Sequence, residues 1–181
     1  MSDSYQIKDQ NATYFLTCQV VGWMDIFSRR VYRDILIKSL EYCIKNKGLV
    51  VYGYVIMTNH LHLILRSTVG NLSDTVHDFK SFTSHRILKE IEHHPQESRK
   101  DWMKIVFQYH AKFNKRVTNQ QLWTHHNHAV ELINAEMIDS RLKYIHENPV
   151  RAGWVEQAQD YIYSSARNYA DLPSLLPIEK L

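Results

Sequence analysis

Cysteine is scarce in this chain, and long apolar runs are missing. The two cysteines among the 181 residues, Cys18 and Cys43, lack the spacing of a metal-binding or redox motif and suit a reducing compartment. No stretch approaches the roughly 18 apolar residues of a membrane-spanning helix. The N-terminal sequence MSDSYQIKDQ contains no apolar signal segment. We therefore expect a cytoplasmic protein that does not enter a membrane.

A strong excess of one charge is also lacking. The 22 lysines and arginines and the 19 aspartates and glutamates leave a net charge of +3. That balance permits binding to nucleic acid but does not by itself indicate it. Hydrophobic residues make up 44% of the chain and charged residues 23%, as in ordinary soluble proteins. The length is that of one domain and no internal repeat is visible, so we expect a single domain over residues 1–181.

Strand and helix patterns alternate along the chain. Runs rich in β-branched and aromatic residues predict strands, and apolar residues at helical spacing predict helices. Gly48 is suited to end the first helix. Pro149 is expected to end the last one, because the residue before a proline is pushed out of the helical region. The expected strands cover residues 13–23, 49–57 and 60–66, and the expected helices cover residues 28–48, 71–91, 102–113 and 134–148. Residues 121–132 are expected to form a strand or a strand-like loop.

This order of elements predicts the fold class. The short link Thr58-Asn59 is expected to turn a hairpin, and residues 93–101 are expected to form a polar loop or an exposed tip between helices. A β-α-β-β-α-β order with antiparallel neighbours fits an α+β fold of the ferredoxin-like type. We expect a two-layer structure with an antiparallel sheet, helices on one face, and an additional C-terminal helix.

Two histidines interrupt the apolar sequence GYVIMTNHLHLIL at residues 53–65. Side chains alternate faces along a strand, so His60 and His62 share one face, opposite the leucines between and after them. Two such imidazoles can point at one cation or one anion. They can equally be two solvated side chains on a polar face. Because the flanking strands are almost entirely apolar, a buried imidazole here would need a hydrogen-bond partner or a metal.

A later helix offers a further ligand. Tyr144 and Asn148 are four residues apart and lie on one helix face. Two histidines and an asparagine, with water and phosphate oxygens, suit Mg²⁺ or Mn²⁺. The Tyr144 phenol would then stand beside a metal-polarised phosphate. The alternative for Tyr144 is an ordinary half-buried helix tyrosine.

These motifs resemble a known family. GYVIMTNHLHLIL resembles the HUH signature, in which U is a bulky apolar residue, and LKYIHENPVRAGWV resembles the catalytic helix and exit loop of single-tyrosine HUH transposases. Within that superfamily the chain is most similar to the REP-associated tyrosine transposases. FKSFTSHRI, LWTHHNHAVEL and DYIYSSARNY also resemble family blocks, in the family order, so the resemblance covers most of the chain. Thr58 departs from the proline that usually precedes Asn-His.

The resemblance implies a role for each matching residue. His60 and His62 match the HUH metal ligands, Asn148 matches the third ligand, and Tyr144 matches the nucleophile. The implied substrate is single-stranded or hairpin DNA, and the implied cofactor is Mg²⁺ or Mn²⁺. Attack by the phenol leaves a free 3′-hydroxyl and a 5′-phosphotyrosine, so rejoining needs no ATP. Relatives occur as monomers and as homodimers in which the tyrosine helix can act in trans.

The residues that would contact DNA stay unassigned. Two basic groups lie on different predicted helices, and such groups are usually solvated helix faces, although they can neutralise phosphates. They are Arg29, Arg30 and Arg33 on the first helix and Lys80, Arg86 and Lys89 on the second.

Three alternative functions stay open at this point. A domesticated DNA-binding protein would keep the fold without recombining DNA. A zinc-dependent hydrolase would add one further histidine to His60 and His62. An RNA-binding sheet would explain neither histidine and lacks the usual aromatic motif. The histidines available to the hydrolase are His125, His126 and His128, of which we expect His128 to be structural at a strand end.

Overall fold

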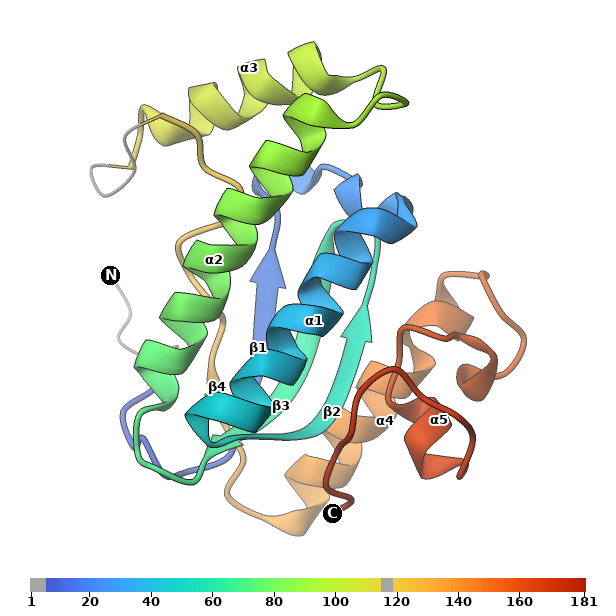
Figure 1. Ribbon diagram of the computed structural model, residues 1–181. Coiled ribbons are helices and arrows are strands. Elements are labelled where there is room, and N and C mark those ends of the chain that lie inside the picture. Colours follow the sequence, from blue (N-terminus) through green and yellow to red (C-terminus); the bar gives the residue numbers. More distant parts are fainter. Residues whose placement is uncertain (1–5, 115–118) are drawn as a thin grey trace.

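The computed structural model describes residues 6–114 and 119–181, and its centre is an antiparallel sheet (Figure 1). Within these residues the strands are β1 (Tyr14–Gln19), β2 (Leu49–Ile56), β3 (His60–Ser67) and β4 (Val130–Glu131), in the spatial order β2-β3-β1-β4. β1 pairs antiparallel with β3 and β4, and β2 pairs antiparallel with β3. The expected ferredoxin-like topology is confirmed. The first five residues of the N-terminal segment lie outside the described residues.

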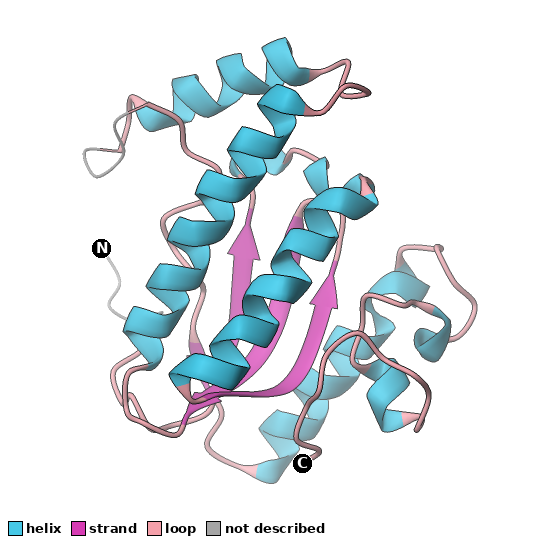
Figure 2. Cartoon of the chain, viewed as in Figure 1, coloured by secondary structure: helices cyan, strands magenta, loops and turns pink. Residues whose placement is uncertain are grey.

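Helices lie on both sides of this sheet, as Figures 1 and 2 show. α1 (Arg30–Lys47) and α2 (Leu72–His93) run side by side over one face, and α3 (Lys100–Ala111) crosses the far end of α2. α4 (Ala135–Arg151) packs on the opposite face and is followed by the short α5 (Ala166–Tyr169). The described 3₁₀ helices are η2 (Val21–Trp23), η3 (Ile26–Ser28) and η4 (Ala158–Asp160). None of the described helices combines the length and apolarity needed to cross a bilayer.

The side chains on the two faces of β3 pack into two different apolar clusters. Ile64 packs with Ile145 of α4 in an apolar cluster on one face, and His60 and His62 share that face by strand alternation. The other face belongs to the main core under α1 and α2. Its β3 members are Leu61, Leu63 and Leu65. The sheet therefore separates a wholly apolar layer from a layer that mixes apolar side chains with two imidazoles.

We predict that Leu63→Ala lowers the free energy of unfolding by about 2–5 kcal/mol, because it leaves a cavity in the main core. His60→Ala should cost less, since His60 is partly exposed and lies outside that core. Urea unfolding of both variants beside the wild type measures the difference. Equal losses for the two substitutions would contradict the assignment of the two faces.

Gly53 allows α4 to approach the sheet closely. The register of β2 against β3 shifts between Val51 and Gly53, which marks a bulge in β2. A Cβ atom at position 53 would lie 2.9 Å from Leu142 Cδ1 of α4, closer than carbon atoms pack. Because glycine has no side chain, the Leu142 side chain of α4 can pack directly against the backbone of β2.

The C-terminal segment runs along the outer edge of β2. Ser165 N–H donates to the Tyr54 carbonyl (2.9 Å), and Glu179 N–H donates to the Val51 carbonyl (3.0 Å). These hydrogen bonds satisfy carbonyl groups that an edge strand would otherwise leave to solvent.

The first expected strand is shorter than residues 13–23. β1 ends at Gln19, because the backbone turns at Gly22 and Trp23, where φ is 63° and 54°. A strand cannot continue through two residues of positive φ. This turn was not recognisable from the β-branched and aromatic composition of the segment.

Residues 121–132, expected as a strand or a strand-like loop, are mostly loop. Only β4 forms a ladder, and Trp123 makes one isolated bridge. Between them the chain is irregular and has a positive φ of 42° at His128. The loop nevertheless covers the edge of β1, where Thr17 N–H donates to the Asn127 carbonyl (2.8 Å).

The start of α4 is as predicted, and its end is not. Asn134 caps the helix, since its Oδ1 accepts from Met137 N–H (2.8 Å). The helix continues for two residues after Pro149. Pro149 lies in the last turn, where it removes a single N–H, and the Ala152 N–H still donates to the Asn148 carbonyl (3.0 Å). Asn148 is therefore helical, although a residue before proline usually prefers an extended backbone.

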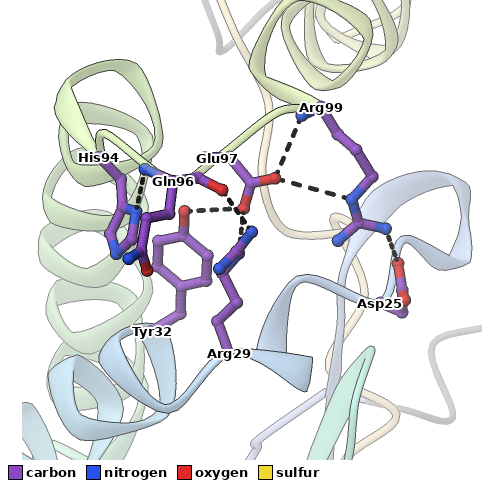
Figure 3. Close-up of polar contacts among 7 residues, drawn as sticks. All are labelled: Asp25, Arg29, Tyr32, His94, Gln96, Glu97 and Arg99. Atoms are coloured by element: carbon purple, nitrogen blue, oxygen red, sulfur yellow. Dashed lines mark hydrogen bonds and ion pairs between the residues drawn. The ribbon is translucent and has the colours of Figure 1, made fainter.

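The polar segment 93–101 contains a buried carboxylate, which corrects the expectation of an exposed tip (Figure 3). Glu97 is only 3% exposed. Its Oε2 accepts from Arg29 Nε (2.8 Å) and from the Tyr32 hydroxyl (3.2 Å), and its Oε1 accepts from the Arg99 backbone N–H (3.3 Å). Arg99 in turn pairs with Asp25 at 2.7 Å. The network ties the α2–α3 connection to the start of α1.

The Glu97→Gln substitution tests this network. Burial raises the pKa of the Glu97 carboxyl, but the hydrogen bonds from Arg99, Tyr32 and Arg29 outweigh burial and the pKa is lowered. A lowered folded-state pKa stabilises the fold above the unfolded-state pKa, and that stability is lost as pH falls through the acid range. At pH 7 we expect Glu97→Gln to cost about 1–3 kcal/mol, with the difference from wild type shrinking toward pH 3.

Urea titrations at both pH values measure this effect. Glu92→Gln, an exposed position on α2, is the matched control and should change little at either pH. A penalty for Glu97→Gln that stays constant with pH would show that the ionised carboxylate is not what stabilises the fold.

Candidate active site

His60 and His62 lie side by side on the face of β3 that α4 covers, with ring centroids 4.7 Å apart. Thr17 of β1 is the cross-strand partner of His62, and its hydroxyl lies 2.8 Å from His62 Nδ1. Asn59 Oδ1 lies 2.6 Å from His60 Nδ1. Each imidazole is therefore held through Nδ1, so that Nε2 is the nitrogen left for a ligand.

The protonation of both rings suits metal binding. Asn59 Oδ1 can only accept, so His60 carries its proton on Nδ1 and keeps a lone pair on Nε2. Burial lowers the pKa of His60. The pKa of His62 falls to about 3, first through burial and then through the charges of neighbours that include Arg141 and Arg151. Both rings are thus neutral at neutral pH, the form in which histidine binds metal.

An unpartnered atom marks the centre of the site. His62 is 5% exposed, and among the described residues its Nε2 finds no hydrogen-bond partner. A buried polar nitrogen normally has such a partner, and its absence carries a free-energy penalty. A divalent cation with water and phosphate ligands would satisfy this atom, so the donor set fits the implied metal.

Tyr144 of α4 stands next to this pair within the same chain. Its ring centroid is 5.2 Å from that of His62 and 6.1 Å from that of Phe15. Tyr144 is 38% exposed, so a substrate can reach this residue from outside. The structure therefore brings together the strand histidines and the helix tyrosine that the sequence singled out.

Asn148 lies one helical turn after Tyr144 and is partly exposed. Its amide Nδ2 donates to the Tyr144 carbonyl (3.2 Å), so its hydrogen bond goes to the helix backbone rather than to either histidine. The amide oxygen stays available to a ligand. The structure thus places Asn148 on the Tyr144 side of α4 without a direct contact to the imidazoles.

The zinc hydrolase alternative finds no matching cluster. Within residues 6–114 and 119–181, no three His, Cys, Asp or Glu side chains gather closely enough to hold a metal ion. The loop histidines therefore do not join His60 and His62. His128 lies two residues before β4, in keeping with a structural place near a strand end.

Residues next to Tyr144 anchor α4 to the sheet. Ile145 is fully buried, and His146 Nε2 lies 2.9 Å from the hydroxyl oxygen of Ser165. That same oxygen accepts from Tyr54 N–H of β2 (2.9 Å). The DYIYSSARNY segment thus fixes how far α4 is rotated about its axis, and that rotation decides which residues face the histidines.

Sequence reasoning missed two arginines beside the site. Arg141 and Arg151 share the helix face of Tyr144 and Asn148, at spacings of three, four and three residues. The Arg141 guanidinium carbon lies 5.0 Å from the centroid of the Phe15 ring, and that of Arg151 lies 4.6 Å from the centroid of the Tyr144 ring. The same spacing that linked Tyr144 to Asn148 would have found both.

Four of the six basic side chains considered for DNA contact have other contacts. Arg30 Nε lies 3.5 Å from Asp34 Oδ2. Arg29 belongs to the network around the buried carboxylate, and the Arg33 guanidinium carbon lies 4.2 Å from the centroid of a tyrosine ring. Lys80 donates to a carbonyl and a side-chain amide in loop 124–127, at 2.9 and 2.5 Å. Arg86 and Lys89 are exposed on α2, on the far side of the sheet from the histidines.

Comparisons with known proteins agree with this geometry. Residues 24–108 match the family described as "Transposase IS200 like". The solved structure of a REP-associated tyrosine transposase bound to a REP hairpin shares the fold with a TM-score of 0.63 and 17% sequence identity, covering 99% of this chain and 93% of that chain. No curated protein matches the chain in sequence.

The two matches cover the site differently. The family match includes His60 and His62 and ends before Tyr144. The structural match extends over almost the whole chain, including α4. The family match therefore supports the resemblance over residues 24–108, and the structural match confirms the fold over almost the whole chain.

Proposed function

We propose that this chain, whose residues 24–108 belong to the IS200-like transposase family, is a metal-dependent DNA transposase that cleaves and rejoins single-stranded or hairpin DNA through a phosphotyrosine. The observation that carries the proposal is the position of the Tyr144 ring against His62, whose Nε2 is buried without a partner. The structural relative is bound to a REP hairpin, which supports a hairpin as the DNA partner.

In this mechanism three residues bind the metal and two others orient the histidines. His60 and His62 present neutral Nε2 atoms, and Asn148 presents an amide oxygen, as ligands for Mg²⁺ or Mn²⁺. When bound, the cation supplies Lewis-acid polarisation of the scissile phosphate. Thr17 and Asn59 orient the two imidazoles through Nδ1, as partners outside the ligand shell commonly do.

Tyr144 carries out the covalent step. Its phenol oxygen bonds to phosphorus as its proton passes to solvent, and the bond from phosphorus to the 3′ oxygen breaks. The leaving oxygen takes up a proton and becomes a free 3′-hydroxyl, while the 5′ phosphate stays on Tyr144. Rejoining reverses these steps with an incoming 3′-hydroxyl. Because the tyrosine and the histidines belong to one chain, we propose that cleavage requires no second copy.

Tyr144→Phe should abolish covalent attachment to DNA, because it removes only the phenol oxygen, and should leave DNA binding and folding near wild type. The measurement is incubation with labelled hairpin oligonucleotides and Mn²⁺, followed by denaturing electrophoresis for a protein–DNA adduct. Tyr109→Phe, an exposed tyrosine on α3, is the matched control and should form the adduct normally.

Two outcomes would contradict this proposal. An adduct with Tyr144→Phe would assign the nucleophile to another tyrosine. Tyr161 and Tyr163 are poor substitutes, since their hydroxyls donate to the Ile56 carbonyl (2.7 Å) and to Asp34 (2.7 Å). Tight hairpin binding by the wild type without any adduct would favour the alternative, a domesticated DNA-binding protein of the same fold.

His62→Ala should weaken Mn²⁺ binding by more than about tenfold. Loss of a residue that only orients a metal ligand already has about that effect, and His62 is proposed to bind the metal itself. Asn148→Ala should also weaken it. Isothermal titration calorimetry without DNA measures the affinity. His85→Ala, an exposed histidine on α2, is the control and should bind like wild type. Unchanged affinity in His62→Ala would remove His62 from the ligand set.

A further inference from the structure

The histidine-facing side of α4 carries two guanidinium groups that the proposed chemistry does not use. Arg141 and Arg151 stand on either side of Tyr144 along the helix, ten residues apart. At a rise of 1.5 Å per residue their Cα atoms are separated by about 15 Å along the axis. That length spans several nucleotides of one DNA strand, whose charges lie on its phosphates.

Arg141 is positioned by an aromatic platform rather than by a carboxylate. Its guanidinium carbon lies 5.0 Å from the centroid of the Phe15 ring. Phe15 also stacks on His62, with ring centroids 5.3 Å apart. Within the part of the chain that the structure describes, Arg141 pairs with no Asp or Glu. Its charge is therefore held beside the site without an internal counter-ion.

Arg151 reaches back over the reactive side chain. Helix side chains lean toward the N-terminus, and this one places its guanidinium carbon 4.6 Å from the centroid of the Tyr144 ring. Its Nη2 donates to the Tyr144 carbonyl (3.0 Å), and its Nη1 lies 3.3 Å from Glu147 Oε2. Glu147 neutralises part of this charge, yet the guanidinium plane stays against the phenol.

Both charges stand beside the site. Arg141 lies over the Phe15 ring and Arg151 over the Tyr144 ring, and each of these two rings contacts His62. Among the described residues, these two guanidinium groups bring positive charge to the rings around Tyr144. A phosphate is the anion that a planar guanidinium recognises best, through two parallel hydrogen bonds.

We infer that Arg141 and Arg151 bind backbone phosphates of a single DNA strand on the two sides of the phosphate that Tyr144 attacks. α4 then supplies the nucleophile and the groups that fix the strand across it. This assignment rests on the proposed function for the position of the attacked phosphate. The contacts themselves are to phosphate and so are independent of base sequence.

The test measures binding without chemistry. In a Tyr144→Phe background with EDTA, the affinity for a labelled single-stranded oligonucleotide is determined over a series of salt concentrations. Removing a phosphate contact by Arg141→Gln or Arg151→Gln should weaken binding about tenfold. It should also reduce the slope of log affinity against log salt by roughly 0.7, the value for one phosphate on a single strand.

Lys143→Gln is the matched control. It removes the same charge from the same helix, but Lys143 is exposed, its Nζ lies 3.7 Å from Glu147 Oε1, and it contacts no aromatic ring of the site in the described residues. Its affinity and salt slope should stay near those of the parent. Arg141→Lys and Arg151→Lys keep the charge while losing the planar fork. They should keep the slope and bind a few-fold less tightly, with an unchanged melting temperature.

The outcomes separate this inference from the proposed function. If both glutamine variants bind like Lys143→Gln, the inference is overturned, even where the wild type forms a DNA adduct. If the lysine variants lose binding as completely as the glutamine variants and melt earlier, the arginines act through packing and the inference is also overturned. Loss of binding only in the glutamine variants supports the phosphate contacts, even if no adduct ever forms.

Discussion

The close packing of α4 on the histidine face of the sheet is the constraint on which the candidate site depends. Gly53 lets Leu142 approach the strand, and the contact between His146 and Ser165 fixes the rotation of the helix. Once rotation is fixed, helical spacing decides which side chains meet β3. Tyr144 then contacts His62, and the same geometry carries the two arginines to the site. The close approach of α4 to the strand at Gly53 thus helps to determine which side chains of the helix lie beside the histidines.

Local periodicity was enough to predict the parts of the site that lie within single elements. Strand alternation separated His60 and His62 from the leucines of β3, and helical spacing placed Tyr144 with Asn148. The order of elements also predicted the topology. The meeting of strand and helix came from the family resemblance, since no local pattern states which strand a helix covers. The metal and nucleophile roles are proposals that the geometry supports.

What sequence reasoning missed depends on partners distant in the chain. Glu97 sits in a segment as polar as any loop, and it is buried because Arg29 and Tyr32, more than sixty residues earlier, surround it. Pro149 failed to end α4 because a single lost N–H in a final turn costs little once the helix is packed. The segment before β4 is aromatic and partly buried, yet its backbone follows the edge of β1 as a loop.

Irregular parts of the same chain lie along the outer side of β2 and along β1 beyond the two-residue β4. The loop before β4 runs along β1, and the C-terminal segment runs along β2. An open edge offers unpaired backbone groups to the strands of other molecules, which is a route to aggregation and to shared sheets. Here a second molecule could pair with β2, or with β1 beyond β4, only after displacing one of these segments. At these two strands the fold therefore carries its own protection against edge-to-edge polymerisation.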